Sequence, residues 1–180
     1  LWKKRKFPIL LVVGTDCDTG KMTTAWELTK ALKSRNKKVE FLGTGQTGIL
    51  LSGNGIPIDA IISDFIPGEI ENAIKKFEQN LDLLIVEGQG AINNTLYSGV
   101  TLGLLHGSMP DFLIMTHEPT RKHDVSGNKI PCLASLIKMH YDLLRPFKKC
   151  KFSGVNLLTL KISKSEAINT FNLLKNELKL

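Results

Sequence analysis

The chain has 180 residues, 42% of them hydrophobic and 23% charged, and a formal net charge of +7. This length and composition suit one ordinary globular domain, and no apolar run approaches the roughly 20 residues that a membrane-spanning helix needs. Apart from the runs "KKRK" at residues 3–6 and "RPFKKCK" at residues 145–151, the basic residues are scattered. They come without an RNA-binding signature, so we expect neither a nucleic-acid nor a membrane partner. Three cysteines without paired spacing argue against a disulfide framework and favour a reducing, cytoplasmic compartment.

Strand-like apolar runs alternate with helix-like segments, which predicts a mainly parallel sheet covered by helices. The first strand is expected at residues 7–13 and the helix after it at residues 21–34, where apolar residues recur at helical spacing. Further strands are expected at 38–44, 81–87, 111–116 and 151–160, further helices at 69–79 and 165–178, and irregular structure at 43–57 and 88–101. Because ligands of open parallel sheets bind beyond the carboxyl ends of the strands, the loops after the first four strands should share one site.

The first of these loops is typical of a phosphate-binding loop. The segment "GTDCDTGK" begins at Gly14 and ends at Gly20 and Lys21, between a strand-like run and an amphipathic helix. Glycines in such a turn let backbone N–H groups point at phosphate oxygens, the helix N-terminus adds partial positive charge, and the lysine reaches the terminal phosphates. The residues predicted to bind the phosphorylated ligand are Gly14, Thr15, Asp16, Cys17, Asp18, Thr19, Gly20, Lys21, Met22 and Thr23.

Two details of this loop depart from the standard form. Five residues, rather than four, separate the glycines, and Met22 stands where a serine or threonine would hold magnesium. A thioether is a poor ligand for a hard cation, and Thr23 lies about 100° further round the helix. Three interpretations stay open: the longer loop turns Thr23 toward a metal ion, the metal ion is held elsewhere, or no metal ion is needed.

Other candidate site residues follow the later strands. Glu87 ends the third strand, where phosphate-loop proteins place a second metal ligand. Asp64 precedes a Pro-Gly turn, where it either faces the site or caps a helix. His117, after the fourth strand, has either a structural role or a role as acid, base or hydrogen-bond donor. Arg121 either pairs with a phosphate or carboxylate, or is solvated.

The two acidic residues inside the loop need an explanation of their own. Asp16 and Asp18 would repel a phosphate group unless a metal ion or a substrate cation intervenes. Their presence indicates that the loop meets something positive.

Five motifs together resemble one protein family: "GTDCDTGKMTT", "GTGQTG", "VEGQGA", "YSGVTLGLLHGSMPD" and "THEPTR". From Phe7 to about Leu178 the chain resembles the C-terminal domain of the DgcN-like D-glutamate N-acetyltransferases, a bacterial and archaeal family. The resemblance implies an α/β fold, a P-loop NTPase-like three-layer αβα sandwich with a mainly parallel sheet, in a single domain of residues 1–180. It also implies that this domain is the C-terminal part of a longer chain, because full-length members carry an additional N-terminal Rossmann-like domain. Met22 is usual in that family.

A more distant similarity is to dethiobiotin synthetase and the cobyrinic acid amidating enzymes. It rests on the Gly-Thr-Asp start of the loop, on the five-residue spacing and on the Val-Glu-Gly at the end of the third strand. It implies that Lys21 binds phosphate and that Glu87 binds magnesium. Those enzymes have a threonine directly after the lysine, where this chain has Met22, which puts the geometry of a metal site in question.

The family resemblance implies a domain that binds a nucleotide or CoA in an enzyme that acetylates an acidic amino acid, with His117, Asp64 or Glu87 as the base and acetyl-CoA as the donor. The alternative is an ATP- and Mg²⁺-dependent carboxylate-activating enzyme, with the metal ion held by Thr23 and Glu87. A third hypothesis is a non-catalytic nucleotide switch. The expected partners are therefore a nucleotide or CoA and a small acidic substrate.

A homo-oligomer is also expected. The apolar stretch "YSGVTLGLL" leaves Val100, Leu102, Leu104 and Leu105 to be covered. Covering of the sheet by these residues is the alternative explanation.

Overall fold

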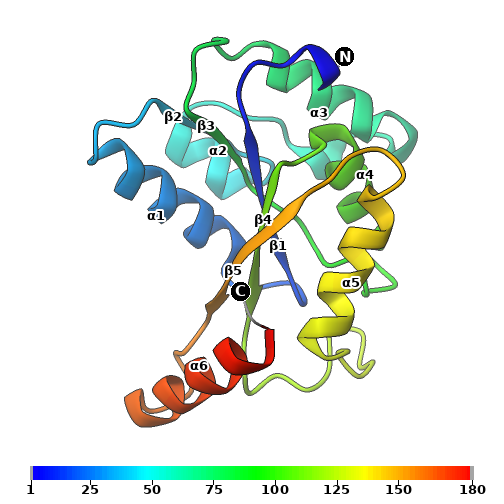
Figure 1. Cartoon of the computed structure of the whole chain (residues 1–180). Helices are drawn as coiled ribbons and strands as arrows, with labels where there is room; N and C mark the ends of the chain where they lie inside the picture. The colour runs from blue at the N-terminus through cyan, green and yellow to red at the C-terminus, as the bar shows by residue number, and fades with distance from the viewer. Residues whose placement is uncertain (1, 179–180) are drawn as a thin grey trace.

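The computed structural model describes residues 2–178 and shows a five-stranded sheet with helices on both faces (Figure 1). The strands are β1 (Ile9–Gly14), β2 (Val39–Leu42), β3 (Leu83–Val86), β4 (Phe112–His117) and β5 (Lys151–Leu157). They lie in the order β2-β3-β1-β4-β5, and each neighbouring pair is parallel. The carboxyl ends of the strands therefore meet at one edge of the sheet, where the loops that follow them converge.

The helices lie between and after these strands. The α-helices are α1 (Lys21–Lys33), α2 (Gln46–Ser52), α3 (Ile66–Lys75), α4 (Ser98–Ser108), α5 (Leu133–Leu144) and α6 (Lys164–Leu178), and the short 3-10 helices are η1 (Trp2–Lys4), η2 (Ile58–Ala60) and η3 (Ser63–Phe65). α1 packs on one face of the sheet, and α3, α4 and α5 cover the other. The result is a three-layer αβα sandwich.

β1 is the central strand, and each of its residues is buried. An uninterrupted apolar run is typical of a parallel strand that is covered on both faces. Ile9 and Leu11 face the core under α3, α4 and α5, whereas Leu10 and Val12 face the core under α1. This burial on both faces holds the start of the following loop in a fixed position.

α4 packs closely against α3 because glycines line the contact. A Cβ atom on Gly103 would lie 2.6 Å from Ile66 Cγ2, and one on Gly107 would lie 2.7 Å from the carbonyl oxygen of Pro67. Leu104 and Leu105 are buried in the core of the same chain. Covering of the sheet, the alternative to a homo-oligomer, therefore accounts for these two residues. The homo-oligomer itself stays a prediction.

The edge of the sheet at the amino ends of β1 and β4 is held by one carboxylate. Asp111, just before β4, accepts hydrogen bonds from Arg5 Nη2 and from Ile9 N, both at 2.9 Å, and a third from Lys148 Nζ. Arg5 also donates to carbonyl oxygens at the end of α4. Burial alone would raise the pKa of Asp111, but the bonds from Lys148 and Ile9 outweigh it and hold the pKa below its usual value. Arg5, in the basic N-terminal run, is therefore a structural cation.

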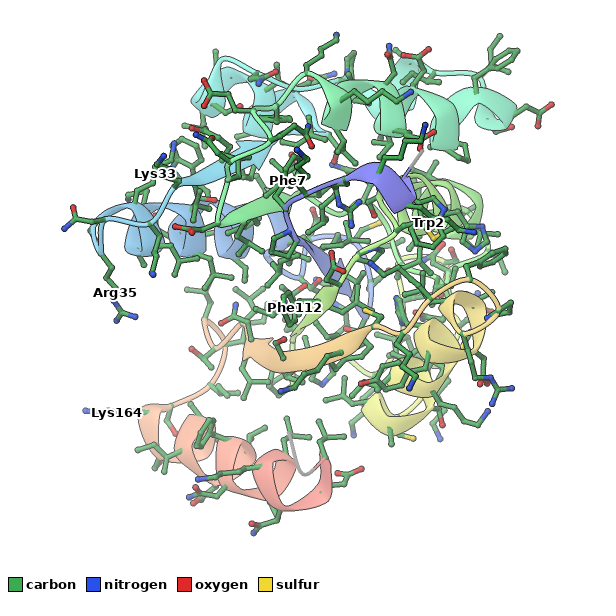
Figure 2. All side chains as sticks on the ribbon, turned by 45° about the horizontal axis from the view of Figure 1, so that its top comes forward. Trp2, Phe7, Lys33, Arg35, Phe112 and Lys164 are labelled. Atoms are coloured by element: carbon green, nitrogen blue, oxygen red, sulfur yellow. The ribbon has the colours of Figure 1, made fainter. Side chains whose placement is uncertain are left out.

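Other basic side chains project into solvent at separate places. Lys33 and Arg35 extend from the end of α1, and Lys164 extends from the start of α6 (Figure 2). This distribution agrees with the scattered basic residues of the sequence. No helix within residues 2–178 combines the length and the hydropathy needed to cross a membrane.

The predicted parallel sheet and its αβα architecture are confirmed, with strand ends that differ by a few residues. The predictions of irregular structure are wrong in two places, because α2 lies within 43–57 and α4 begins within 88–101. Both helices contain glycine, which is a poor helix former, and α4 is apolar on several sides, so it lacks the one-sided periodicity of a surface helix. α5 has a clear apolar face but was absent from the predicted elements.

The buried His140 of α5 should make the stability of the fold depend on pH. Its Nδ1 donates to the carbonyl oxygen of Leu136 at 2.7 Å, and its Nε2 is buried without a partner among residues 2–178. Burial lowers the pKa of His140 below its usual value of 6.5. The unfolded chain therefore binds this proton more readily, so the free energy of unfolding should fall as the pH drops below about 6.5.

Urea unfolding of the wild type and of His140→Phe at about pH 7.5 and about pH 5.5 tests this dependence. The phenylalanine ring can keep the edge contact with Phe152 but cannot titrate. We expect the wild type to lose more stability between the two pH values than the variant does. Equal losses would contradict the prediction.

Candidate functional site

The loop between β1 and α1, residues 15–20, wraps around the side chain of Lys21. Gly20, just before the helix, has a φ of 91°, in the left-handed region that favours glycine. A Cβ atom on Gly14 would lie 2.7 Å from Thr19 Oγ1 and 3.0 Å from Lys21 Nζ. Gly20 thus turns the chain into the helix, and Gly14 leaves the space that the loop and the lysine occupy.

Lys21 points back into this loop. Its Nζ donates to the carbonyl oxygen of Asp16 at 2.7 Å, and the residue is only 8% exposed. Burial lowers the pKa of Lys21 to about 8, although the negative charges of Asp16 and Asp18 act in the opposite direction. An ammonium group that is so poorly hydrated would gain a strong charge-assisted hydrogen bond from a phosphate oxygen.

Hydroxyl groups attach the loop to the end of β4. Thr19 Oγ1 lies 2.7 Å from Thr116 Oγ1, and Thr15 Oγ1 lies 3.1 Å from His117 Nδ1. Burial lowers the pKa of His117, against the charge of Glu118, so its imidazole is neutral near pH 7. Within residues 2–178, no hydrogen bond engages its Nε2. The ring is therefore oriented by the loop and keeps one nitrogen available.

Asp16 is fully buried and joins three loops. Its Oδ2 accepts hydrogen bonds from Arg121 Nη1 and Val125 N, both at 3.0 Å, and its Oδ1 accepts one from Asn94 Nδ2 at 3.2 Å. Arg121 and Val125 follow β4, and Asn94 follows β3. The carboxylate therefore ties the loop of Lys21 to the two neighbouring loops, and the positive charge that Asp16 meets is that of Arg121.

Arg121 is held on several sides. Its Nη1 donates to the carbonyl oxygen of Cys17 at 2.6 Å, and its Nε donates to Glu118 Oε2 at 2.8 Å. Glu118 also pairs with Lys161 Nζ at 2.7 Å. The hydrogen bonds from Lys161 and then Arg121 hold the pKa of Glu118 below its usual value, although burial acts against them. A direct contact between Arg121 and a phosphorylated ligand stays a prediction.

Glu87 lies directly after β3, close enough to Lys21 for that charge to act on its carboxyl group. Its Oε2 accepts the backbone N–H groups of Thr44 at 2.8 Å and Gly45 at 3.1 Å, just before α2. A Cβ atom on Gly48 would lie 2.1 Å from Oε2, so α2 packs directly on the carboxylate. Burial raises the pKa of Glu87, against the two backbone bonds and the charge of Lys21. Oε1 forms no hydrogen bond to the described residues and is free for a ligand.

The two residues predicted to hold magnesium differ in how well they fit. Glu87 fits, because Mg²⁺ commonly takes one or two carboxylates and completes its shell with water and phosphate oxygens. Thr23 is exposed on the first turn of α1 and, within the chain described, has no hydrogen bond to Glu87 or Lys21. Among residues 2–178 no three His, Cys, Asp or Glu side chains gather as a metal site. A metal ion bound here would therefore rely on Glu87 and on the ligand's own oxygens.

Asp64, a predicted catalytic residue, is exposed in η3 and makes no ion pair with any residue from 2 to 178. Sequence reasoning missed several residues that organise the site: Thr44, Asn94, Thr116 and Glu118. Thr116 and Glu118 flank His117 in "MTHEPTR", so their place next to the strand end was available as a signal. Asn94 lies in a stretch without local periodicity, and nothing in the sequence around it indicated a role in the site.

A cavity of about 560 Å³ opens beside the loop where β4 ends. His117 and Arg121 line it, and both also contact the loop of Lys21. Lys122, His123 and Lys129 line it as well, and we call it the basic cavity. The site thus consists of a loop that encloses an ammonium group and an adjoining cavity whose wall is largely apolar and carries basic side chains from the segment after β4.

A buried parallel strand, a glycine loop that encloses a lysine and a helix that begins at that lysine define this chain as a P-loop domain. The chain belongs to the DUF1611 family: residues 2–180 match the model described as "Domain of unknown function (DUF1611_C) P-loop domain". This match, together with the two relatives described next, confirms the family resemblance inferred from the sequence motifs.

Two curated relatives have the same name. The chain is 41% identical over 169 residues to a D-glutamate N-acetyltransferase of Tritonibacter scottomollicae. The aligned region covers 92% of this chain and 50% of the relative. It is 49% identical over 120 residues to a D-glutamate N-acetyltransferase of a Pseudoalteromonas species, and that aligned region covers 67% of this chain and 36% of the relative. The chain thus spans half or less of the length of these relatives.

Solved structures agree with the fold. A DUF1611 family protein from Anabaena variabilis is 32% identical, with a TM-score of 0.94 over 99% of this chain and 53% of that protein. Cobyrinic acid a,c-diamide synthase from Mycobacterium smegmatis, solved with bound ADP and magnesium, is 11% identical, with a TM-score of 0.61 over 94% of this chain and 81% of the other. At 11% identity the likeness shows the fold alone.

Replacement of Asp16 by asparagine should destabilise the protein. Asp16→Asn keeps the size of the side chain but removes the charge that faces the buried side of Arg121 and places an N–H donor against other donors. We expect the free energy of unfolding to fall by about 2–4 kcal/mol, measured by urea unfolding.

Asp18→Asn is the matched control, because Asp18 lies in the same loop, is exposed and has a φ of 55° that asparagine also tolerates. Its effect should stay within about 0.5 kcal/mol. Equal losses for the two variants would show that the contacts of Asp16 do not hold the loops together.

Proposed function

We propose that the loop at residues 14–21 binds the phosphates of acetyl-CoA, and that the protein transfers the acetyl group to the amino group of a D-glutamate-like amino acid. The observation that carries the proposal is the buried ammonium group of Lys21, which a glycine loop holds at a helix N-terminus by one backbone carbonyl. Such a place suits a pyrophosphate group. The two relatives named D-glutamate N-acetyltransferase support the reaction. The activity is proposed for the whole protein, since the chain spans half or less of those relatives.

The transfer needs an amine without its proton and a group that accepts one. His117 suits this role, because burial lowers its pKa, Thr15 orients its Nδ1, and its Nε2 is available. The amino nitrogen attacks the thioester carbonyl carbon and gives up a proton to Nε2. The C–S bond then breaks, and the sulfur of CoA leaves as a thiol after it takes up a proton. Glu87 and Asp64 are the alternative bases, but Glu87 Oε2 already accepts two N–H groups.

A second candidate is ATP- and magnesium-dependent activation of a carboxylate. The observation that favours it is the Glu87 carboxylate, whose pKa burial raises against the charge of Lys21 and whose Oε1 forms no hydrogen bond to the described residues. Cobyrinic acid a,c-diamide synthase, which shares the fold, was solved with ADP and magnesium. Magnesium would neutralise charge on phosphate oxygens, and Glu87 would hold it. Met22, a poor ligand for that ion, counts against this candidate.

Removal of the loop lysine should weaken whichever phosphorylated ligand binds. We expect Lys21→Ala to lower the affinity for acetyl-CoA by about 1.5–3 kcal/mol, since it removes a charge-assisted hydrogen bond. Isothermal titration calorimetry with acetyl-CoA, and separately with ATP and Mg²⁺, measures the effect. The control is Lys37→Ala, an exposed lysine after α1.

An unchanged affinity of Lys21→Ala for every ligand that binds would refute the loop assignment. Binding of ATP with Mg²⁺, without binding of acetyl-CoA, would replace the proposed function by the second candidate.

Removal of the proposed base should slow the reaction without abolishing binding of the donor. Release of free CoA thiol from acetyl-CoA in the presence of D-glutamate measures turnover. We expect His117→Asn to lower kcat by about 10²-fold or more, and to change the calorimetric affinity for acetyl-CoA much less. The asparagine amide takes the place of Nδ1, so it can still bond to Thr15, but it offers no base at the position of Nε2. Full turnover in the variant would assign the proton transfer to another residue.

A further inference from the structure

The basic cavity is a binding place that the phosphate loop does not account for. It lies where the chain leaves β4 and leads into α5, and Leu174 and Glu177 of α6 form part of its wall. Its volume of about 560 Å³ is within the range of small-molecule sites. Because His117 and Arg121 contact both the loop and the cavity, a ligand in the cavity lies next to a ligand on the loop.

The positive charge of this cavity is not used inside the described chain. Arg121 is neutralised by two carboxylates. Lys122 and Lys129, in contrast, form no ion pair with any residue from 2 to 178. Among residues 2–178, Glu177 is the one acidic residue of the lining. Two unpaired ammonium groups against one carboxylate favour a ligand with more negative than positive charges.

The backbone that carries the two lysines is held in place. His123 and Lys129 form an antiparallel bridge, and Ile130 N donates to the carbonyl oxygen of Lys122 at 2.9 Å. The buried Asp124 closes the turn between them, because its Oδ1 accepts two backbone N–H groups of that turn. The N-terminus of α5, which has no side-chain cap, opens on the same cavity and adds partial positive charge. Lys122 and Lys129 are therefore anchored at their backbones while their ends stay free.

We propose that the basic cavity binds the acidic amino acid that accepts the acetyl group, with Lys122 and Lys129 pairing with its two carboxylates; this inference rests on the proposed function. The charges match in number, because a dicarboxylic amino acid carries two carboxylates and one amino group, and the cavity offers two lysines and one acid. His117 lines the same cavity, so an amino group bound there lies beside a neutral imidazole. Lys122 and Lys129 are then the residues that select a second carboxylate over an amide.

The test is calorimetric binding of D-glutamate and D-glutamine to the protein and to the double variant Lys122→Ala/Lys129→Ala. The matched control is Lys37→Ala/Lys76→Ala, which removes two exposed lysines elsewhere on the surface. We expect the wild type and the control to bind D-glutamate about tenfold or more tightly than D-glutamine, since a second charge-assisted pair distinguishes them. The double variant should lose that preference, and the wild-type preference should shrink as salt is added.

Acetyl-CoA binding to the same variants separates the two proposals. Unchanged acetyl-CoA affinity in the double variant, together with the lost preference for D-glutamate, supports the inference. A preference for D-glutamate that survives the double substitution overturns it and leaves the proposed function intact. A double variant that weakens acetyl-CoA but not D-glutamate overturns it too, because the cavity then holds part of the donor. Absence of acetyl-CoA binding to the wild type, with D-glutamate binding as expected, contradicts the proposed function alone.

Discussion

The burial of one carboxylate, that of Asp16, determines how the carboxyl edge of the sheet is built. A fully buried charge is tolerated only when it is paired and hydrogen-bonded, and Asp16 takes its partners from the loops after β3 and β4. Those loops must therefore stand close to the loop of Lys21. The positions of His117 and of the basic cavity follow from the same requirement, since both belong to the segment that Arg121 holds.

The opposite edge of the sheet is organised in a comparable way. Asp111 gathers Arg5, Lys148 and the backbone of Ile9, and so fixes where β1 and β4 begin. At both edges a cation with a structural role is withdrawn from solvent. Lys21 is then the cation enclosed by the loop, and Lys122 and Lys129 are cations beside it that form no ion pair within residues 2–178. A formal charge of +7 is thus a poor guide to binding, because it does not distinguish cations held in structural ion pairs from cations that a ligand can reach.

The sheet, its outer layers and the loop of Lys21 follow from the sequence because their signals are local. A run such as residues 9–14 is apolar without interruption, and a glycine loop between strand and helix is recognisable from spacing alone. The role of Asp16 was not predictable in the same way, since Asn94 and Arg121 are 78 and 105 residues away along the chain. α4 was hidden for another reason: Gly103 and Gly107 look unfavourable for a helix, and only the approach of α3 explains them.

One side chain, Arg121, faces two places at once, since it lines the basic cavity and holds the carboxylate that anchors the phosphate loop. Any ligand that displaces this guanidinium from Asp16 changes the free energy of the loop, and with it the affinity for whatever the loop binds. Thermodynamic linkage makes such an effect reciprocal, so occupancy of the loop alters the affinity of the cavity by the same factor. Binding at the loop and binding in the basic cavity would then be coupled even where the two ligands never touch.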